Sequence, residues 1–300
     1  MIAVDWGSTR LRAYRLDAAG NVIAQQRNDH GVLACNGDFA AVLASVVEPW
    51  DDTDIMLSGM IGSRGGWHEQ PYVDCPAGIA ELGEAVSLVP APELPTRRLW
   101  FVPGVADHTA PEAPDVMRGE ETQVCALLGL LQQGTHLLCL PGTHSKWITV
   151  RDGRIANVST AMTGETYAVL RQHSVLGKLM DKDDSRFDAH AFDAGLRRSA
   201  DDSGLLHHLF GVRTLGLFNQ WSAAALPSYL SGLLIGHEVR ASGVFTRTPR
   251  PAQVHLIGND RLLAAYARTL VALGIGVQRH PEHLAANGMH ALWQFRTHAT

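Results

Sequence analysis

The chain opens on Met1-Ile-Ala-Val-Asp5-Trp6-Gly7-Ser8-Thr9-Arg10, an apolar run that ends in an acidic residue and a turn of small residues. This stretch predicts a strand over residues 1–5 and a turn at residues 7–9. The residues that follow predict a second strand over 11–16, an Asp/Gly turn and a third strand over 22–26. The opening therefore indicates a three-stranded unit with a glycine turn after its first strand.

The same succession returns in the middle of the chain. A strand is predicted over 136–140, followed by the turn Pro141-Gly142-Thr143-His144-Ser145 and by strands over 146–150 and 154–160. A duplicated supersecondary unit predicts two similar α/β domains. If these domains face each other, their glycine turns point into one cleft.

Helical patterns set the expected domain limits. A helix is predicted over 39–47, and long helices are predicted within 218–238. The segment 119–132 is expected to be a helix that crosses between the domains. We therefore expect a first domain over residues 1–118 and a second over 119–300, with the C-terminal helix packed back on the first domain as an alternative.

Composition excludes several classes of function. The 300 residues are 46% hydrophobic and 18% charged, with a formal net charge of −5. This balance is typical of a soluble globular protein and gives neither nucleic acid nor an anionic membrane a basic surface to bind. No signal peptide and no membrane-spanning run is recognised. The four scattered cysteines are expected to be reduced core residues of a cytoplasmic protein, and the histidines lack metal-ligand spacing.

The first turn has the groups that hold a phosphate. Gly7 lets the backbone approach a ligand closely, and Ser8 and Thr9 can donate from their hydroxyl and N–H groups. Arg10 can reach the same anion, although a surface position on the following strand explains it equally well. Asp5, at the strand end, can hold Mg²⁺ through water. A plain hairpin turn is the alternative for this stretch.

The second turn repeats these donors and adds a lysine. Gly142, Thr143 and Lys146 follow a predicted strand, although the Walker A pattern is absent. Later in the chain, Gly258 and Asn259 also follow a predicted strand and suit a nucleoside lying against backbone. An ordinary turn between strand and helix is the alternative there. Two matched turns favour a binding site for nucleotide phosphates.

Two adjacent acids, Glu120 and Glu121, open the helix predicted within 119–132. Acids in a first turn interact favourably with the helix macrodipole, which is the commoner reason to find them there. Phosphoryl transfer to an alcohol also needs a carboxylate that orients the hydroxyl and takes its proton. The residues leave open whether one of these acids is the base, and which.

Several stretches together resemble one group of enzymes. Two phosphate turns, a late glycine turn and an acid between them resemble the sugar kinases of the actin/hexokinase/Hsp70 superfamily. Six stretches look like the 2-dehydro-3-deoxygalactonokinase family: Asp5-Trp-Gly-Ser-Thr9, Ser58-Gly-Met-Ile-Gly-Ser63, Met117-Arg-Gly-Glu-Glu-Thr-Gln123, Pro141-Gly-Thr-His-Ser-Lys-Trp147, Met162-Thr-Gly-Glu165 and Ser231-Gly-Leu-Leu-Ile-Gly236.

The resemblance implies a fold and a reaction. The fold is α/β, with two similar ribonuclease-H-like domains and an interdomain cleft. The reaction is ATP- and Mg²⁺-dependent phosphorylation of 2-dehydro-3-deoxy-D-galactonate at its 6-hydroxyl, in galactonate catabolism. In the related glycerol and xylulose kinases, a catalytic Asp opens a helix before the second turn. Glu120 and Glu121 match that Asp by position but not by identity.

The implied substrate is an anion, and its carboxylate needs a cationic or N–H partner. Arg64, in a glycine-rich loop, and Arg118, beside the acids, are the candidates that follow from the resemblance. Trp67 is a candidate to stack against the sugar chain. A tight turn and a core tryptophan are the alternative interpretations of this loop.

Other functions compete with this one. A kinase for another sugar or sugar acid, such as 2-keto-3-deoxygluconate, shares the phosphate turns. A non-enzymatic regulator on the same fold often carries a DNA-binding segment before the first turn, and this turn begins near residue 5. An Hsp70-like or actin-like ATPase is expected to need segments for which 300 residues leave no space. The sequence does not predict an oligomeric state.

Overall fold

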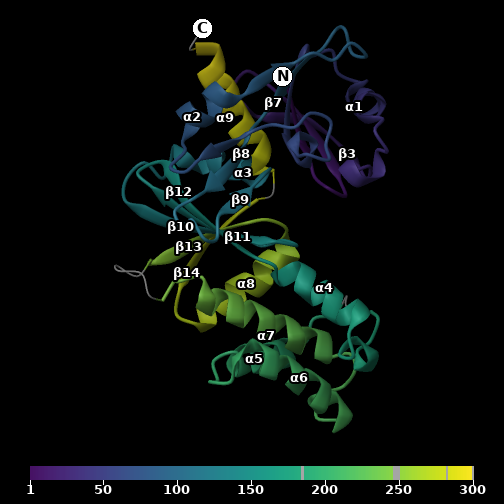
Figure 1. Cartoon of the computed structure of the whole chain (residues 1–300), viewed down its shortest axis with the longest axis vertical. Helices are drawn as coiled ribbons and strands as arrows, with labels where there is room; N and C mark the ends of the chain where they lie inside the picture. The colour runs from purple at the N-terminus through teal and green to yellow at the C-terminus, as the bar shows by residue number, and fades with distance from the viewer. Residues whose placement is uncertain (184–185, 246–250, 282, 299–300) are drawn as a thin grey trace. The chain divides into compact units, whose positions relative to one another are not determined.

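The computed structural model describes residues 1–183, 186–245, 251–281 and 283–298 (Figure 1). Contacts divide the chain into two units. The first unit comprises Met1–His136, Ile148–Val158 and Pro281–Thr300, and the second comprises Leu137–Trp147 and Ser159–His280. Residues 119–136, which the sequence assigned to a second domain, fall in the first unit by this division.

The first unit contains two sheets. The larger sheet consists, in spatial order, of β3 (Val22–Asn28), β2 (Leu11–Leu16), β1 (Ile2–Trp6), β4 (Asp54–Gly59), β7 (Arg98–Phe101) and β6 (Ser87–Val89). β1 pairs antiparallel with β2 and parallel with β4, and β4 pairs parallel with β7. The smaller sheet consists of β5 (Tyr72–Asp74), β8 (Gly104–Asp107) and β9 (Asp115–Met117).

A five-stranded sheet repeats the order of the first one. Its strands are, in spatial order, β12 (Arg154–Ala161), β11 (Ser145–Arg151), β10 (Thr135–Leu140), β13 (Gln253–Ile257) and β14 (Gly276–His280). β10 pairs parallel with β13, and β13 pairs parallel with β14. In both sheets, the third, second and first strands of the repeat are followed by two parallel strands. The predicted duplication is therefore confirmed.

Helices cover these sheets. In the first unit they are α1 (Phe39–Val47), α2 (Ile79–Ala85), α3 (Glu120–Leu128) and α9 (Leu284–His298). In the second unit they are α4 (Thr163–His173), α5 (Ala189–Arg198), α6 (Gly204–Leu217), α7 (Leu226–Ala241) and α8 (Asp260–Ala272). The prediction of helix over 39–47 is confirmed, whereas residues 218–225 join α6 to α7 and are not part of a long helix.

The central strands β1 and β13 are apolar on both faces because both of their faces are buried. Ile2, Ala3 and Val4 in β1 are fully buried, as expected for a strand with helices on either side. In the second unit, β13 is buried from Val254 to Ile257. These strands hold the turns that follow them, because their positions are fixed by packing on both faces.

α9 packs against α3, β1 and α2 within the first unit. The α3–α9 contact is backbone to backbone: a methyl group added at Gly288 would lie 1.7 Å from the carbonyl oxygen of Thr122. α3 and α9 are therefore packed at close range, with no room for a side chain at Gly288.

Gly288→Ala is expected to lower the free energy of unfolding by about 1–3 kcal/mol, the usual cost of overpacking. The measurement is urea unfolding. The control is Gly129→Ala, because Gly129 has a helical φ of −62° and no atom within 4 Å of an added methyl group. Equal stability of the two variants would contradict a tight α3–α9 contact.

Within the described residues, no helix has the length and apolar character that crossing a membrane requires. Cys35, Cys75, Cys125 and Cys139 are free thiols, and three of them are buried.

Candidate functional site

Three segments of the first unit meet where β1 and β4 end. Because these strands are parallel, their carboxyl ends share one edge of the sheet, where ligands of open α/β sheets bind. Gly59 has a φ of 96°, and an added methyl group there would lie 2.8 Å from the Trp6 carbonyl oxygen. Gly119 has a φ of 107° and lies close to Gly59: an added methyl group at Gly119 would lie 3.1 Å from the Gly59 Cα. Only glycine fits both positions.

Backbone hydrogen bonds fix the first glycine turn. The Gly7 N–H donates to the Arg10 carbonyl over 2.9 Å, and the Val32 N–H donates to the Gly7 carbonyl over 3.0 Å. Ser8 is half-buried and Thr9 is exposed. The structure thus presents a fixed backbone turn with two hydroxyl residues at the sheet edge.

Asp5 and Arg10 differ in how firmly they are placed. The Asp5 carboxylate accepts a hydrogen bond from Arg12 over 3.2 Å, and the two residues face each other in the β1–β2 register. Arg10 is exposed and lies 3.8 Å from Asp29, which is also exposed. Such a surface pair restrains a side chain little.

The two adjacent acids lie in different environments. Glu121 is fully buried: its Oε1 accepts from the Ser58 hydroxyl over 3.1 Å, and its Oε2 accepts from the Gly119 N–H over 2.6 Å. Burial, and then the charge of Glu120, raise the pKa of the Glu121 carboxyl to about 8. Glu120 is half-buried, and its Oε2 accepts from the Arg118 N–H over 3.2 Å.

Arg118 has unused hydrogen-bonding capacity. Its Nη2 donates to the Gln70 carbonyl over 2.7 Å, and its guanidinium lies 4.3 Å from the centre of the Tyr72 ring. Its Nε and Nη1 are buried without a hydrogen-bond partner among the residues that the structure describes. Buried polar groups normally have partners, so these two N–H groups are donors that a bound anion can use.

The two other predicted substrate residues lie in the loop after β4. Arg64 is exposed. Trp67 is half-buried and packs on the core of the first unit, stacked on Phe39 at 6.2 Å and edge-on to Phe101 at 6.3 Å. This packing accounts for the tryptophan without a sugar, and the stacking role remains a prediction.

In the second unit, two turns meet where the parallel strands β10 and β13 end. The Gly258 backbone approaches the second glycine turn: an added methyl group would lie 3.6 Å from the Pro141 carbonyl oxygen. Asn259 is the N-cap of α8, and its side chain accepts from the Leu262 N–H over 3.1 Å. The two predicted nucleotide segments therefore lie side by side.

The stretch Met162-Thr-Gly-Glu165 packs on the second turn. The Glu165 N–H donates to the Thr143 carbonyl over 2.9 Å, and its carboxylate lies 2.5 Å from the His144 Nε2. A methyl group at Gly164 would lie 2.3 Å from the Gly142 carbonyl oxygen. The start of α4 is therefore in direct contact with the turn.

Lys146 points away from solvent. It is buried, and its Nζ donates to the Thr160 hydroxyl over 2.8 Å. The structure thus places the ammonium beside β12, and contact with a phosphate remains a prediction.

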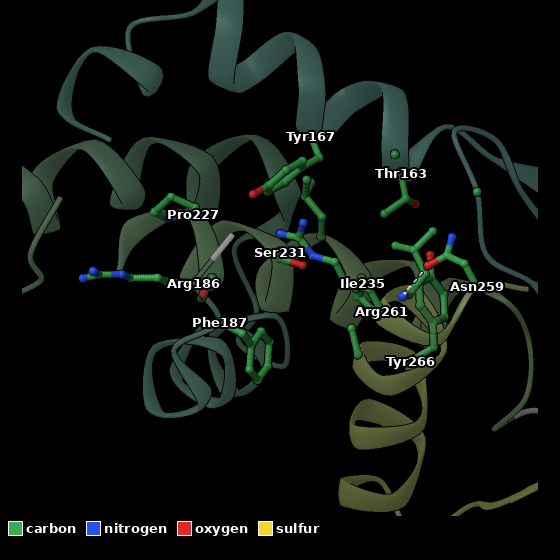
Figure 2. Close-up of a pocket in the computed structure, with 16 residues that line it drawn as sticks. Thr163, Tyr167, Arg186, Phe187, Pro227, Ser231, Ile235, Asn259, Arg261 and Tyr266 are labelled. Carbon is green, nitrogen blue, oxygen red and sulfur yellow. Dashed lines mark hydrogen bonds between the residues drawn. The ribbon is translucent and has the colours of Figure 1, made fainter. Parts of the chain in front are cut away.

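A cavity of about 330 Å³ opens beside these turns. Figure 2 shows side chains from α4, α7 and α8 around it. Gly142 and Asn259 line it, as does Ser231 from one of the family-like stretches. The sequence did not assign a role to the other polar and aromatic residues of the wall: Thr163, Tyr167, Arg186, Phe187, Ser228, Arg261 and Tyr266.

The sequence indicates this cavity wall only weakly. Ser228, Ser231 and Ile235 follow one face of α7 at helical spacing, but small residues on a helix usually indicate close packing. Among the described residues, no three acidic, histidine or cysteine side chains gather as a metal site.

Comparisons with known proteins agree along nearly the whole chain. The family model of 2-keto-3-deoxy-galactonokinase matches residues 5–292. A curated 2-dehydro-3-deoxygalactonokinase of Escherichia coli (strain K12) is 33% identical over 280 residues, which cover 92% of this chain and 91% of that protein. A Rhizobium meliloti (strain 1021) protein assigned to the same activity is 33% identical over 287 residues, covering 92% and 90%.

Solved structures agree with this. A protein from Sinorhizobium meliloti assigned as a 2-dehydro-3-deoxygalactonokinase superposes with a TM-score of 0.87 at 31% identity, covering 99% of this chain and 98% of that one. An activator of 2-hydroxyisocaproyl-CoA dehydratase from Clostridium difficile, with bound ADPNP, shares the fold at a TM-score of 0.53 and 12% identity, covering 99% and 94%. The predicted actin/hexokinase/Hsp70 ATPase fold is confirmed. The chain belongs to the 2-keto-3-deoxy-galactonokinase family.

Proposed function

We propose that this protein phosphorylates 2-dehydro-3-deoxy-D-galactonate at its 6-hydroxyl, with ATP as donor, and releases the 6-phosphate and ADP during galactonate catabolism in the cytoplasm. The observation that carries the proposal is a match over 92% of the chain to a curated relative named 2-dehydro-3-deoxygalactonokinase. The local geometry supports it, because each copy of the repeat presents its glycine turn at the edge of a sheet.

ATP binds to the second unit in this proposal. The cavity beside Gly142 and Asn259 has apolar and aromatic walls, which suit a nucleoside. Thr143 and the Gly258 backbone lie next to it, where the phosphates leave the cavity. Lys146 is the remaining candidate of this unit for a phosphate contact.

The first turn supplies the other phosphate contacts. Gly7, Ser8 and Thr9 offer backbone and hydroxyl donors to the terminal phosphates, and Arg10 is a candidate that its exposure leaves unrestrained. Asp5 fits Mg²⁺ as a single carboxylate, because Mg²⁺ keeps several waters and takes further oxygens from phosphate. Such an ion would neutralise charge that develops on the phosphates.

We assign the general base to Glu120. Its half-buried carboxylate can face a ligand, whereas Glu121 has no exposed surface and uses both oxygens in hydrogen bonds. Glu120 orients the 6-hydroxyl and accepts its proton as the oxygen attacks the γ-phosphorus. The bond between that phosphorus and the β–γ bridging oxygen breaks, and ADP leaves.

Glu121 has a different part in this proposal. Its carboxyl joins Ser58 at the end of β4 to the Gly119 N–H at the start of α3. It therefore fixes the helix start on which Glu120 stands. Because its pKa is raised to about 8, this carboxyl is mostly protonated at neutral pH.

The carboxylate of the sugar acid binds to Arg118. The Nε and Nη1 of Arg118 are buried without a hydrogen-bond partner among the described residues, so their N–H groups are the donors left for a carboxylate. Reaching them requires the substrate or the loop to displace the groups that now cover them. Arg64 is the second candidate, and Trp67 lines the same loop.

Arg118→Lys is expected to raise the KM for the sugar acid about tenfold to a hundredfold, because lysine cannot make a bidentate pair. The KM for ATP should change little. The matched variant is Arg64→Lys, which alters an exposed cation of the neighbouring loop. A larger effect in Arg64→Lys than in Arg118→Lys would transfer the carboxylate contact to Arg64.

The decisive experiment is an ADP-release assay with MgATP and 2-dehydro-3-deoxy-D-galactonate. Parallel reactions contain 2-keto-3-deoxygluconate, galactonate or no sugar. Fast release that depends on the first sugar supports the proposal. Release with another sugar alone replaces the substrate but keeps the kinase. Folded protein that binds ATP and releases no ADP with any of these sugars contradicts the proposed reaction and favours a regulator.

A further inference from the structure

Four polar side chains are buried together directly behind the second glycine turn. They are Ser145 and Trp147 on β11, Glu238 on α7 and Tyr266 on α8, and all lie within the second unit. Glu238 is 6% exposed and Tyr266 is 2% exposed. A carboxyl this deep needs hydrogen-bond donors, because burying it without them is costly.

The donors are present, and they connect three elements. The Trp147 Nε1 donates to the Glu238 Oε1 over 2.8 Å, and the Tyr266 hydroxyl donates to the Glu238 Oε2. The Tyr266 hydroxyl also lies 2.8 Å from the Ser145 hydroxyl. One carboxylate therefore joins the strand that follows the turn to the two helices that flank the cavity.

Each end of this network reaches the proposed ATP site. Ser145 is the last residue of the Pro141–Ser145 turn, and Trp147 shares its strand face two residues later. At the other end, the Tyr266 ring lines the cavity together with Asn259 (Figure 2). A displacement of Glu238 would thus move the turn and the cavity wall relative to each other.

We propose that Glu238 is a positioning residue for ATP: it fixes the second glycine turn against the wall of the nucleotide cavity. This inference rests on the proposed function, because it takes the cavity as the ATP site. Glu238 has no role as a base, since it is buried and its two oxygens accept from Trp147 and Tyr266. It acts through the turn, without touching the nucleotide.

The test measures the dissociation constant of ATP by calorimetry, in the absence of sugar. Glu238→Leu removes both acceptors and is expected to weaken ATP binding about tenfold or more. The hydrogen bonds that hold the turn are then lost, and the donors of Trp147 and Tyr266 stay buried without this partner. Glu238→Gln is expected to restore binding to within about threefold, because its amide oxygen can accept from Trp147 and its NH₂ can donate to the Tyr266 oxygen.

A second variant keeps the test valid where Glu238→Leu does not fold. Tyr266→Phe removes only the hydroxyl that bonds both Glu238 and Ser145, and it should weaken ATP binding several-fold. In the kinase assay, both variants should raise the KM for ATP and leave the KM for the sugar acid unchanged. The control is Glu84→Gln, which alters an exposed carboxylate of the other unit.

The outcomes separate the two proposals. Unchanged ATP affinity in folded Glu238→Leu and Tyr266→Phe, with only a lower melting temperature, would overturn the positioning role. Equal weakening in Glu238→Gln and Glu238→Leu would also overturn it, because the hydrogen bonds would then not be the cause. Wild-type protein that binds ATP but phosphorylates no sugar acid refutes the proposed reaction alone, since the ATP titrations do not depend on turnover.

Discussion

Glu120→Gln is expected to lower kcat by about 10²–10⁴-fold, the usual contribution of a general base. Glutamine keeps the size of the side chain and can still accept from the Arg118 N–H, but it cannot take the proton of the 6-hydroxyl. ATP binding should survive, because the proposed nucleotide cavity lies in the second unit. The measurement is kcat from coupled ADP release, with ATP affinity determined separately.

Glu121→Gln is the matched variant on the neighbouring residue. The pKa of the Glu121 carboxyl is raised to about 8, mainly by burial, so glutamine resembles the neutral form present at pH 7. Its amide can accept from the Gly119 N–H and donate to the Ser58 oxygen. We expect a loss of less than about tenfold, below the scale of a missing base. The reverse order of effects would make Glu121 the base and refute our assignment.

The fold was accessible from the sequence because its signals are local. Three-residue patterns around Gly7 and Gly142 place a turn after the first strand of each copy, and strand alternation does not depend on distant residues. The connection over 218–225 shows the limit. There Asn219 adopts a φ of 55° after the end of α6, and Pro227 stands in the first turn of α7. Both are known signals of helix termini, but the apolar residues around them placed residues 218–225 within the predicted long helices.

The candidate site was accessible only as a set of segments. The sequence places Glu120 and Glu121 at a helix start, but adjacency cannot tell which one is buried. One partner of the buried Glu121 is Ser58, 63 residues away, whose hydroxyl donates to it. Lys146 likewise faces Thr160 through the pairing of two strands. Contacts between distant segments decide these side-chain positions, and the local patterns of a single sequence do not reveal which distant residues will pair.

The second glycine turn can be tested through Gly164, which lies at the start of α4 in the wall of the proposed ATP cavity. Gly164→Ala is expected to weaken ATP binding about tenfold to a hundredfold. The added methyl group would lie 2.3 Å from the Gly142 carbonyl oxygen and 2.8 Å from the Thr143 Cα. Both are backbone atoms of the turn, so the contact can be relieved only by moving the turn or the start of α4. Overpacking of this kind costs about 1–3 kcal/mol, and about 1.4 kcal/mol corresponds to tenfold in affinity.

Gly211→Ala is the control for the same substitution in a helix of the same unit. Gly211 lies within α6, and an added methyl group there has no neighbour within 4 Å. This variant should bind ATP as the wild type does and should be slightly more stable, since alanine favours helix over glycine by about 1 kcal/mol. The measurement is calorimetric titration of both variants with ATP. Wild-type affinity in folded Gly164→Ala would mean that the turn tolerates displacement, and it would remove the second turn from the ATP site that we propose.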